Sequence, residues 1–121
     1  MRLKEIPQEF CICRLEDISQ VDFSEDFCFL GKTDEELSLV CRSSKVPANT
    51  IAKDYGWRAF RIEGILEFSL VGVLSEISAV LADNKIGIFA VSTYNTDYIL
   101  TKEEKFTEAK KALIKNGYLF E

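Results

Sequence analysis

A short polar stretch between two apolar runs restricts the fold of this chain more than any other feature. Residues 92–100 read Ser-Thr-Tyr-Asn-Thr-Asp-Tyr-Ile-Leu, and they connect a strongly apolar strand pattern at 86–93 to a second strand pattern at 97–101. Two strand patterns separated by so few polar residues are typical of a β-hairpin. The chain is therefore expected to turn back on itself here, with a carboxylate and two hydroxyls gathered at the turn.

Helical patterns flank this hairpin on both sides. Apolar side chains recur there at helical spacing, at Leu70, Leu74, Ile77, Leu81, Phe106, Ala109 and Leu113. Strand patterns at 57–63 and 118–120 lie outside the two helices. The order strand, helix, strand, strand, helix, strand predicts an α+β fold of the ferredoxin-like βαββαβ type. Right-handed crossovers would place both helices on one face of its sheet.

Helix ends are also predicted from the sequence. Ser69 is expected to cap the first helix, since its hydroxyl can accept from an unpaired backbone N–H. Thr101 and Glu104 have the spacing of a capping box and are expected to open the second helix. Gly117 is expected to end that helix.

The first half of the chain is richer in strands. Strand patterns occupy residues 9–15, 26–30 and 37–42, and residues 49–54 are expected to form one or two helical turns. No flexible linker separates the halves. We therefore expect an N-terminal module at 1–56 and a C-terminal module at 57–121 within one compact unit.

Composition excludes several classes of function. The 121 residues include no histidine, so Ser-His-Asp and Cys-His mechanisms are ruled out within this chain, and we expect no enzyme activity and no cofactor. The net charge of −5 disfavours nucleic acid. No apolar run approaches the ~18–20 residues that cross a bilayer. The first residues lack the apolar core of a secretory signal, so we expect a cytoplasmic protein with no membrane partner.

The cysteines are expected to be reduced and buried. Cys11, Cys13, Cys28 and Cys41 all lie among apolar neighbours. A zinc site of four thiolates would usually show paired C-x2-C motifs, which this sequence lacks. The sequence therefore predicts no metal site.

Taken together, these patterns resemble the ACT domain family. The resemblance rests on Gly56-Trp57-Arg58, on residues 63–74 (Glu-Gly-Ile-Leu-Glu-Phe-Ser-Leu-Val-Gly-Val-Leu) and on residues 88–100. Residues 33–41 resemble the first module of small bacterial two-module ACT proteins, which are similar to eukaryotic cytosolic arginine sensors. The resemblance implies a ferredoxin-like ACT module preceded by a shorter, strand-rich ACT-like module. It also implies a non-catalytic regulatory or sensor protein that binds a small molecule of the amino-acid class in a homo-oligomer, with a dimer favoured.

The residues themselves suggest where such a ligand would bind. A helix start near Gly72 exposes backbone N–H groups that suit a carboxylate, and Asp97 across the hairpin suits an ammonium group. The expected ligand-binding residues are Phe68, Ser69, Leu70, Val71, Gly72, Thr93, Tyr94, Thr96 and Asp97.

Each of these residues also has a purely structural interpretation. Asp97 is of a type that often hydrogen-bonds its own turn, and Gly72 would also allow close packing of helix on sheet. Tyr94 would also serve to pack across strands. The alternative function is a ligand-free oligomerisation or partner-docking module, because exposed sheet edges pair readily between subunits.

Overall fold

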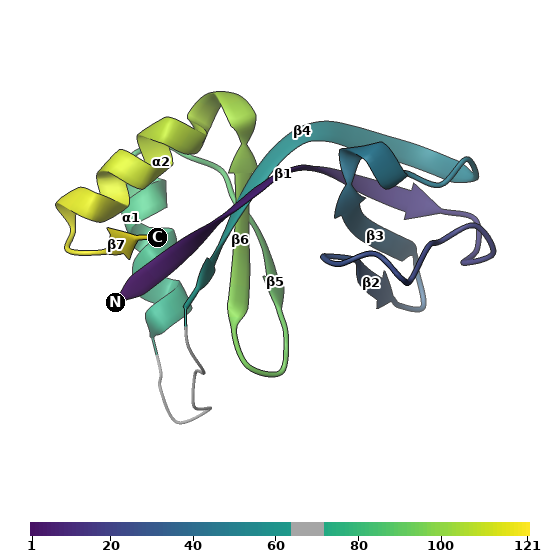
Figure 1. Ribbon diagram of the computed structural model, residues 1–121, viewed down its shortest axis with the longest axis horizontal. Coiled ribbons are helices and arrows are strands. Elements are labelled where there is room, and N and C mark those ends of the chain that lie inside the picture. The colour runs from purple at the N-terminus through teal and green to yellow at the C-terminus, as the bar shows by residue number, and fades with distance from the viewer. Residues whose placement is uncertain (64–71) are drawn as a thin grey trace. The chain divides into compact units, whose positions relative to one another are not determined.

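The computed structural model describes residues 1–63 and 72–121 (Figure 1). Its strands are β1 (Arg2–Leu15), β2 (Phe29–Lys32), β3 (Leu37–Arg42), β4 (Thr50–Ile62), β5 (Phe89–Ser92), β6 (Asp97–Lys102) and β7 (Leu119–Phe120). Its helices are the short 3-10 helix η1 (Ser43–Lys45), α1 (Val73–Asp83) and α2 (Glu103–Lys115). The α+β class predicted from the sequence is confirmed.

The chain forms two compact units. Unit 1 contains residues 1–7 and 58–121, and unit 2 contains residues 8–57. The long strands β1 and β4 contribute residues to both. The division into an N-terminal ACT-like module and a C-terminal ACT module stays a prediction about descent and role, but the first seven residues belong to unit 1.

Unit 1 is a sheet with both α-helices on one face. Its strands lie in the order β7-β1-β4-β6-β5. Strands and helices contribute to a single buried cluster that contains Leu3, Phe60, Ile62, Ile77, Leu81, Ile86, Ile99, Phe106, Ala109, Leu113 and Tyr118. Because side chains from α1 and α2 meet the same strand positions, both helices cover the same face, as the crossover rule predicted.

The start of β1 is an element that the sequence interpretation missed. The expected strand began at residue 9, whereas β1 begins at Arg2. Its first residues pair in parallel with β7, and Glu63 N donates to Arg2 O at 2.9 Å. This segment therefore lies between the first and last strands of the predicted βαββαβ unit, and its Leu3 is fully buried in the core of unit 1.

Both predicted helix starts differ from the structure. The N-cap of α1 is Gly72, not Ser69, which lies outside the described residues. The N-cap of α2 is Lys102, and it makes no side-chain capping hydrogen bond, so the prediction of a capping box at Thr101 and Glu104 is wrong. Thr101 is fully buried as part of β6, and its hydroxyl donates to the carbonyl of Lys102 at 3.3 Å. Burial in the core therefore keeps this hydroxyl away from the helix start.

Unit 2 is built from the strands β2, β3, β1 and β4. The prediction of helical turns at 49–54 is wrong, since β4 begins at Thr50. The amide of Glu16 donates to the carbonyl of Asn49 at 3.3 Å, and this bond ties the entry of β4 to the end of β1. Pairing between strands overrides the weak local helical preference of this segment.

The two hairpins repeat each other. Phe29 begins the β2–β3 pairing and Phe89 begins the β5–β6 pairing, and the two ladders have the same register. In each turn a threonine amide donates to the carbonyl three residues later, at 2.9 Å from Thr33 and at 2.8 Å from Thr93. The hairpin of unit 2 leads into η1, whereas that of unit 1 leads into α2. The units therefore share a hairpin and differ in the helix that follows it.

The cysteines all lie in unit 2. Cys11, Cys13 and Cys41 are buried, and Cys28 is half-buried; all four are free thiols. Cys11 faces Cys41 across the β1–β3 ladder. Burial raises the pKa of Cys13 to about 11 and that of Cys41 to about 12. Within residues 1–63 and 72–121, no three cysteine, histidine or acidic side chains are placed to hold a metal ion.

These thiols predict an order of reaction and a pH dependence. With a thiol reagent on the folded protein, Cys28 is expected to react first, and Cys13 and Cys41 only after unfolding. Because folding raises the pKa of both buried thiols above the ordinary thiol value of 9.0, their contribution to stability is complete below about pH 9. It is lost as the pH rises toward 12. Peptide mapping after timed alkylation tests the order, and equal rates at all four cysteines would contradict it.

Candidate functional site

The β5–β6 turn is a polar structure held by hydrogen bonds of two threonines. The hydroxyl of Thr93 donates to the carbonyl of Thr96 at 3.1 Å, and the backbone amide of Thr93 donates to the same carbonyl. The hydroxyl of Thr96 donates to the carbonyl of Ile62 at 2.7 Å. This second bond fixes the turn to the end of β4. Both threonines of the predicted site therefore hold the turn in place at the same end of the sheet.

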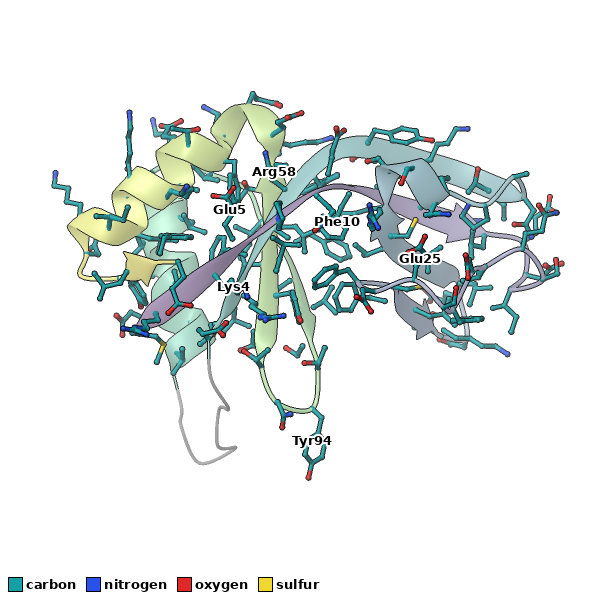
Figure 2. The ribbon with its side chains drawn as sticks, viewed as in Figure 1. Lys4, Glu5, Phe10, Glu25, Arg58 and Tyr94 are labelled. Atoms are coloured by element: carbon teal, nitrogen blue, oxygen red, sulfur yellow. The ribbon has the colours of Figure 1, made fainter. Side chains whose placement is uncertain are left out.

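Asp97 and Tyr94 lie in different surroundings. Asp97 faces Ser92 across the ladder and accepts a hydrogen bond from its hydroxyl. Since side chains alternate along a strand, Asp97 is on the same face as the buried Ile99, which is the face that carries the helices. Tyr94 is 82% exposed at the tip of the turn and points away from it (Figure 2).

Gly72 is the described part of the predicted helix start. Its φ is 86°, in the left-handed region, and a Cβ built there meets nothing within 4 Å. The backbone conformation therefore explains this glycine better than close packing does. The other predicted residues of this segment, Phe68, Ser69, Leu70 and Val71, lie outside the described residues. The predicted site as a whole stays a prediction.

A second polar feature lies on the opposite face of the same sheet. It is an open hollow of about 320 Å³, lined by Arg61, Ile62 and Glu63 of the β4 end and by Thr93, Asn95, Thr96 and Tyr98 of the hairpin. Phe60 and Ile62 belong to the core beneath the helices, so Arg61 between them points to the other face. Thr93 and Thr96 thus border this hollow, whereas Asp97 and Tyr94 are not among its lining residues.

Arg61 lines this hollow and contacts two other lining residues, Tyr98 and Glu63. Its Nη1 donates to the Tyr98 hydroxyl at 3.2 Å, and its Nε lies 3.4 Å from the Glu63 carboxylate. The guanidinium carbon is 5.9 Å from the centroid of the Tyr98 ring. The hydrogen bond with Tyr98 raises the pKa of Arg61 further above its usual value, so this side chain stays charged.

The sequence interpretation missed Arg61 and Glu63. The available signal was the alternation Arg-Ile-Glu at the end of a predicted strand, which places two opposite charges on one face and an apolar side chain on the other. The same alternation occurs as Arg14-Leu15-Glu16 at the end of β1.

The ACT domain family matches residues 53–115, which is more than half of the chain. The chain belongs to the ACT domain family. A protein of Agobacterium tumefaciens is 30% identical to this ACT protein, with a TM-score of 0.88 over 99% of this chain and 91% of the other. No curated protein matches the sequence.

Two more distant structures share the fold. The aspartate kinase of Clostridium acetobutylicum, described as an allosteric enzyme, has a TM-score of 0.66 and 13% identity, and the match covers 93% of this chain and 33% of the kinase. A structure described as a C-terminal regulatory domain of aspartate kinase, from Porphyromonas gingivalis, has a TM-score of 0.55 and 14% identity over 93% of this chain and 92% of that one. At such identities the likeness concerns the fold.

Family membership supports a regulatory role based on small-molecule binding in general terms. The similarity to arginine sensors stays a prediction. Among the described helices, none combines the length and apolar character needed to cross a bilayer.

Proposed function

We propose that this ACT protein is a non-catalytic regulator or sensor that binds a free amino acid, and that it acts in the cytoplasm as a homo-oligomer, with a dimer favoured. The observation that carries the proposal is the position of Asp97, on the helix-bearing face and at the start of a strand whose turn is fixed by Thr96. A carboxylate on this face is available to a ligand ammonium group.

The second half of the proposed site is the start of α1. The first N–H groups of a helix have no partner within the helix and attract a carboxylate. Asp97 and the start of α1 would then bind the two charged ends of one amino acid. In this proposal Thr93 and Tyr94 border the ligand, and Phe68, Ser69, Leu70 and Val71 complete the site with Gly72.

A thermal-shift screen against the twenty common L-amino acids tests the function. A ligand that binds only the folded protein raises its melting temperature in proportion to the logarithm of its concentration. We expect a rise with one amino acid or a small related group. A flat response to all twenty would instead favour the alternative, a ligand-free oligomerisation or docking module.

Replacing Asp97 with alanine tests the assignment of the site. We expect the affinity for the amino acid to fall about tenfold or more, because a charge-assisted contact is lost. The free energy of unfolding should fall by less than about 1 kcal/mol, since a partly exposed carboxylate contributes little to stability. Calorimetric titration and urea denaturation measure the two quantities.

The matched control for this variant is Asp34→Ala, in the corresponding turn of unit 2. Asp34 is exposed there, and its loss should leave both affinity and stability unchanged. Affinity within about twofold of the wild type in Asp97→Ala would make this aspartate a turn residue only.

A further inference from the structure

We propose a second binding site, separate from that of Asp97, in the hollow around Arg61 and Glu63, and we infer that its ligand is a small zwitterion such as a free α-amino acid. Asp97 and Arg61 lie on opposite faces of the same sheet, and the turn at 93–96 borders both sites. Arg61 would bind the carboxylate of the ligand and Glu63 its ammonium group. No residue of the undescribed segment is needed for this site.

The hollow has the size and the polar groups of a small-molecule site. Its volume of about 320 Å³ is in the range of ligand pockets in proteins. Its lining brings together a guanidinium, a carboxylate, a phenol, an amide and two hydroxyls, and only Ile62 is apolar. A compact polar ligand therefore fits this lining better than an apolar one.

The charges in the hollow select the class of ligand. Arg61 and Glu63 carry opposite charges and lie 3.4 Å apart at their nearest atoms. A simple carboxylate would pair with Arg61 and leave Glu63 beside a like charge. A simple amine would pair with Glu63 and leave Arg61 without its counter-ion. A zwitterion gives each side chain a new partner of opposite charge, so it alone leaves no charge unpaired.

The surrounding contacts fix the position of Arg61 while allowing its ion pair with Glu63 to be replaced by contacts with the ligand. The contact with Glu63 is long, at 3.4 Å, and the side chains of Arg61 and Glu63 are partly exposed, at 26% and 32%. Tyr98 holds the guanidinium from the other side at 3.2 Å. The arginine would therefore keep its position when Glu63 turns to the ligand, which lowers the entropic cost of binding.

An ion pair of this kind also occurs where it only supports structure, and the chain contains a matched comparison. Arg14 and Glu16 stand at the end of β1, next to the first hairpin, as Arg61 and Glu63 stand next to the second. Arg14 faces Ser38 across its ladder. Its partner in the β1–β3 ladder is thus a serine, whereas Arg61 donates to a tyrosine hydroxyl, and Arg14→Gln is the control for Arg61→Gln.

The test measures binding of the twenty L-amino acids, one at a time, by calorimetric titration of the full chain. The wild type and the variants Arg61→Gln, Arg61→Lys, Glu63→Gln, Arg14→Gln and Asp97→Ala are compared. For the tightest binder at each site, the methyl ester and the N-acetyl derivative are titrated as well, because each removes one of the two charges. The derivatives test the wild type, so the proposal does not depend on the folding of a variant.

We expect an amino acid to bind at the hollow around Arg61. Arg61→Gln should weaken this binding about 10- to 100-fold, because a charge-assisted contact is lost, while Arg14→Gln and Asp97→Ala should leave it unchanged. Glu63→Gln should weaken binding of the amino acid more than it weakens binding of the N-acetyl derivative, which carries no ammonium group. The methyl ester, which carries no carboxylate, should bind the wild type weakly. A purely structural arginine would not change these preferences among derivatives. Binding that depends on Asp97 alone, or equal binding of the ester, would overturn this second site and leave the proposed function standing. Absence of any binding would overturn both.

Discussion

Replacing Phe60 with alanine is expected to lower the free energy of unfolding by about 3–5 kcal/mol. Phe60 is fully buried in β4 at the centre of unit 1. Its ring meets that of Phe120 edge-to-face at 5.4 Å between centroids and that of Phe106 at 6.4 Å. Truncation removes the buried area of the ring and leaves a cavity that links α2, β4 and β7, so the loss exceeds that of a simple transfer to water.

Urea denaturation monitored by circular dichroism measures this effect. The matched control is Phe23→Ala, because Phe23 is 57% exposed in unit 2 and should change stability by less than about 0.5 kcal/mol. Phe60→Leu should cost less than Phe60→Ala, since it fills most of the space. A loss below about 1 kcal/mol for Phe60→Ala would mean that the core repacks around the gap.

The second large effect is expected from Glu5, which joins three elements of unit 1. Its carboxylate lies 3.1 Å from Arg58 of β4 and 2.7 Å from Lys110 of α2. Both cations also lie over the ring of Phe106, at 5.0 and 6.0 Å from its centroid. Figure 2 shows Glu5 and Arg58 side by side. Glu5→Ala would leave two positive charges together without their counter-ion, at a cost of about 2–3 kcal/mol.

The control for Glu5→Ala is Glu9→Ala, further along the same strand, where the side chain is exposed. This control should be close to neutral. Added salt should recover part of the stability lost in Glu5→Ala, because it screens the repulsion between Arg58 and Lys110. A loss that is unaffected by salt and matches that of Glu9→Ala would show that the three charges are not coupled.

The second half of the fold was predictable because local and long-range signals agree there. The apolar stripes at helical spacing predicted both helices, and α1 (73–83) and α2 (103–115) bury Ile77, Leu81, Phe106, Ala109 and Leu113 of those stripes. The hairpin between them follows from its polar turn. Such agreement among spacing, turn chemistry and topology is what makes a pattern reliable.

The parts that failed depend on neighbours that local patterns do not contain. The capping-box spacing at Thr101 is genuine, but burial against the core decides where that hydroxyl points. Residues 49–54 lack a strong pattern, and their strand forms because β1 pairs with it. Likewise, Arg61 and Glu63 look like ordinary strand-end charges until the β5–β6 turn is placed beside them. Candidate sites of this kind require the strand order as well as the sequence.

The parallel pairing of β1 with β7 also sets the order in which the protein can be assembled during synthesis. Glu121 N donates to Leu3 O at 2.8 Å, and Leu119 N donates to Met1 O at 3.1 Å. The ribosome therefore makes β1 well before β7, because more than 100 residues separate these two paired strands. Unit 2 is fully translated once residue 57 emerges, but in unit 1 the edge of β1 that pairs with β7 stays unpaired until β7 has been made. Translation thus separates the completion of the two units in time.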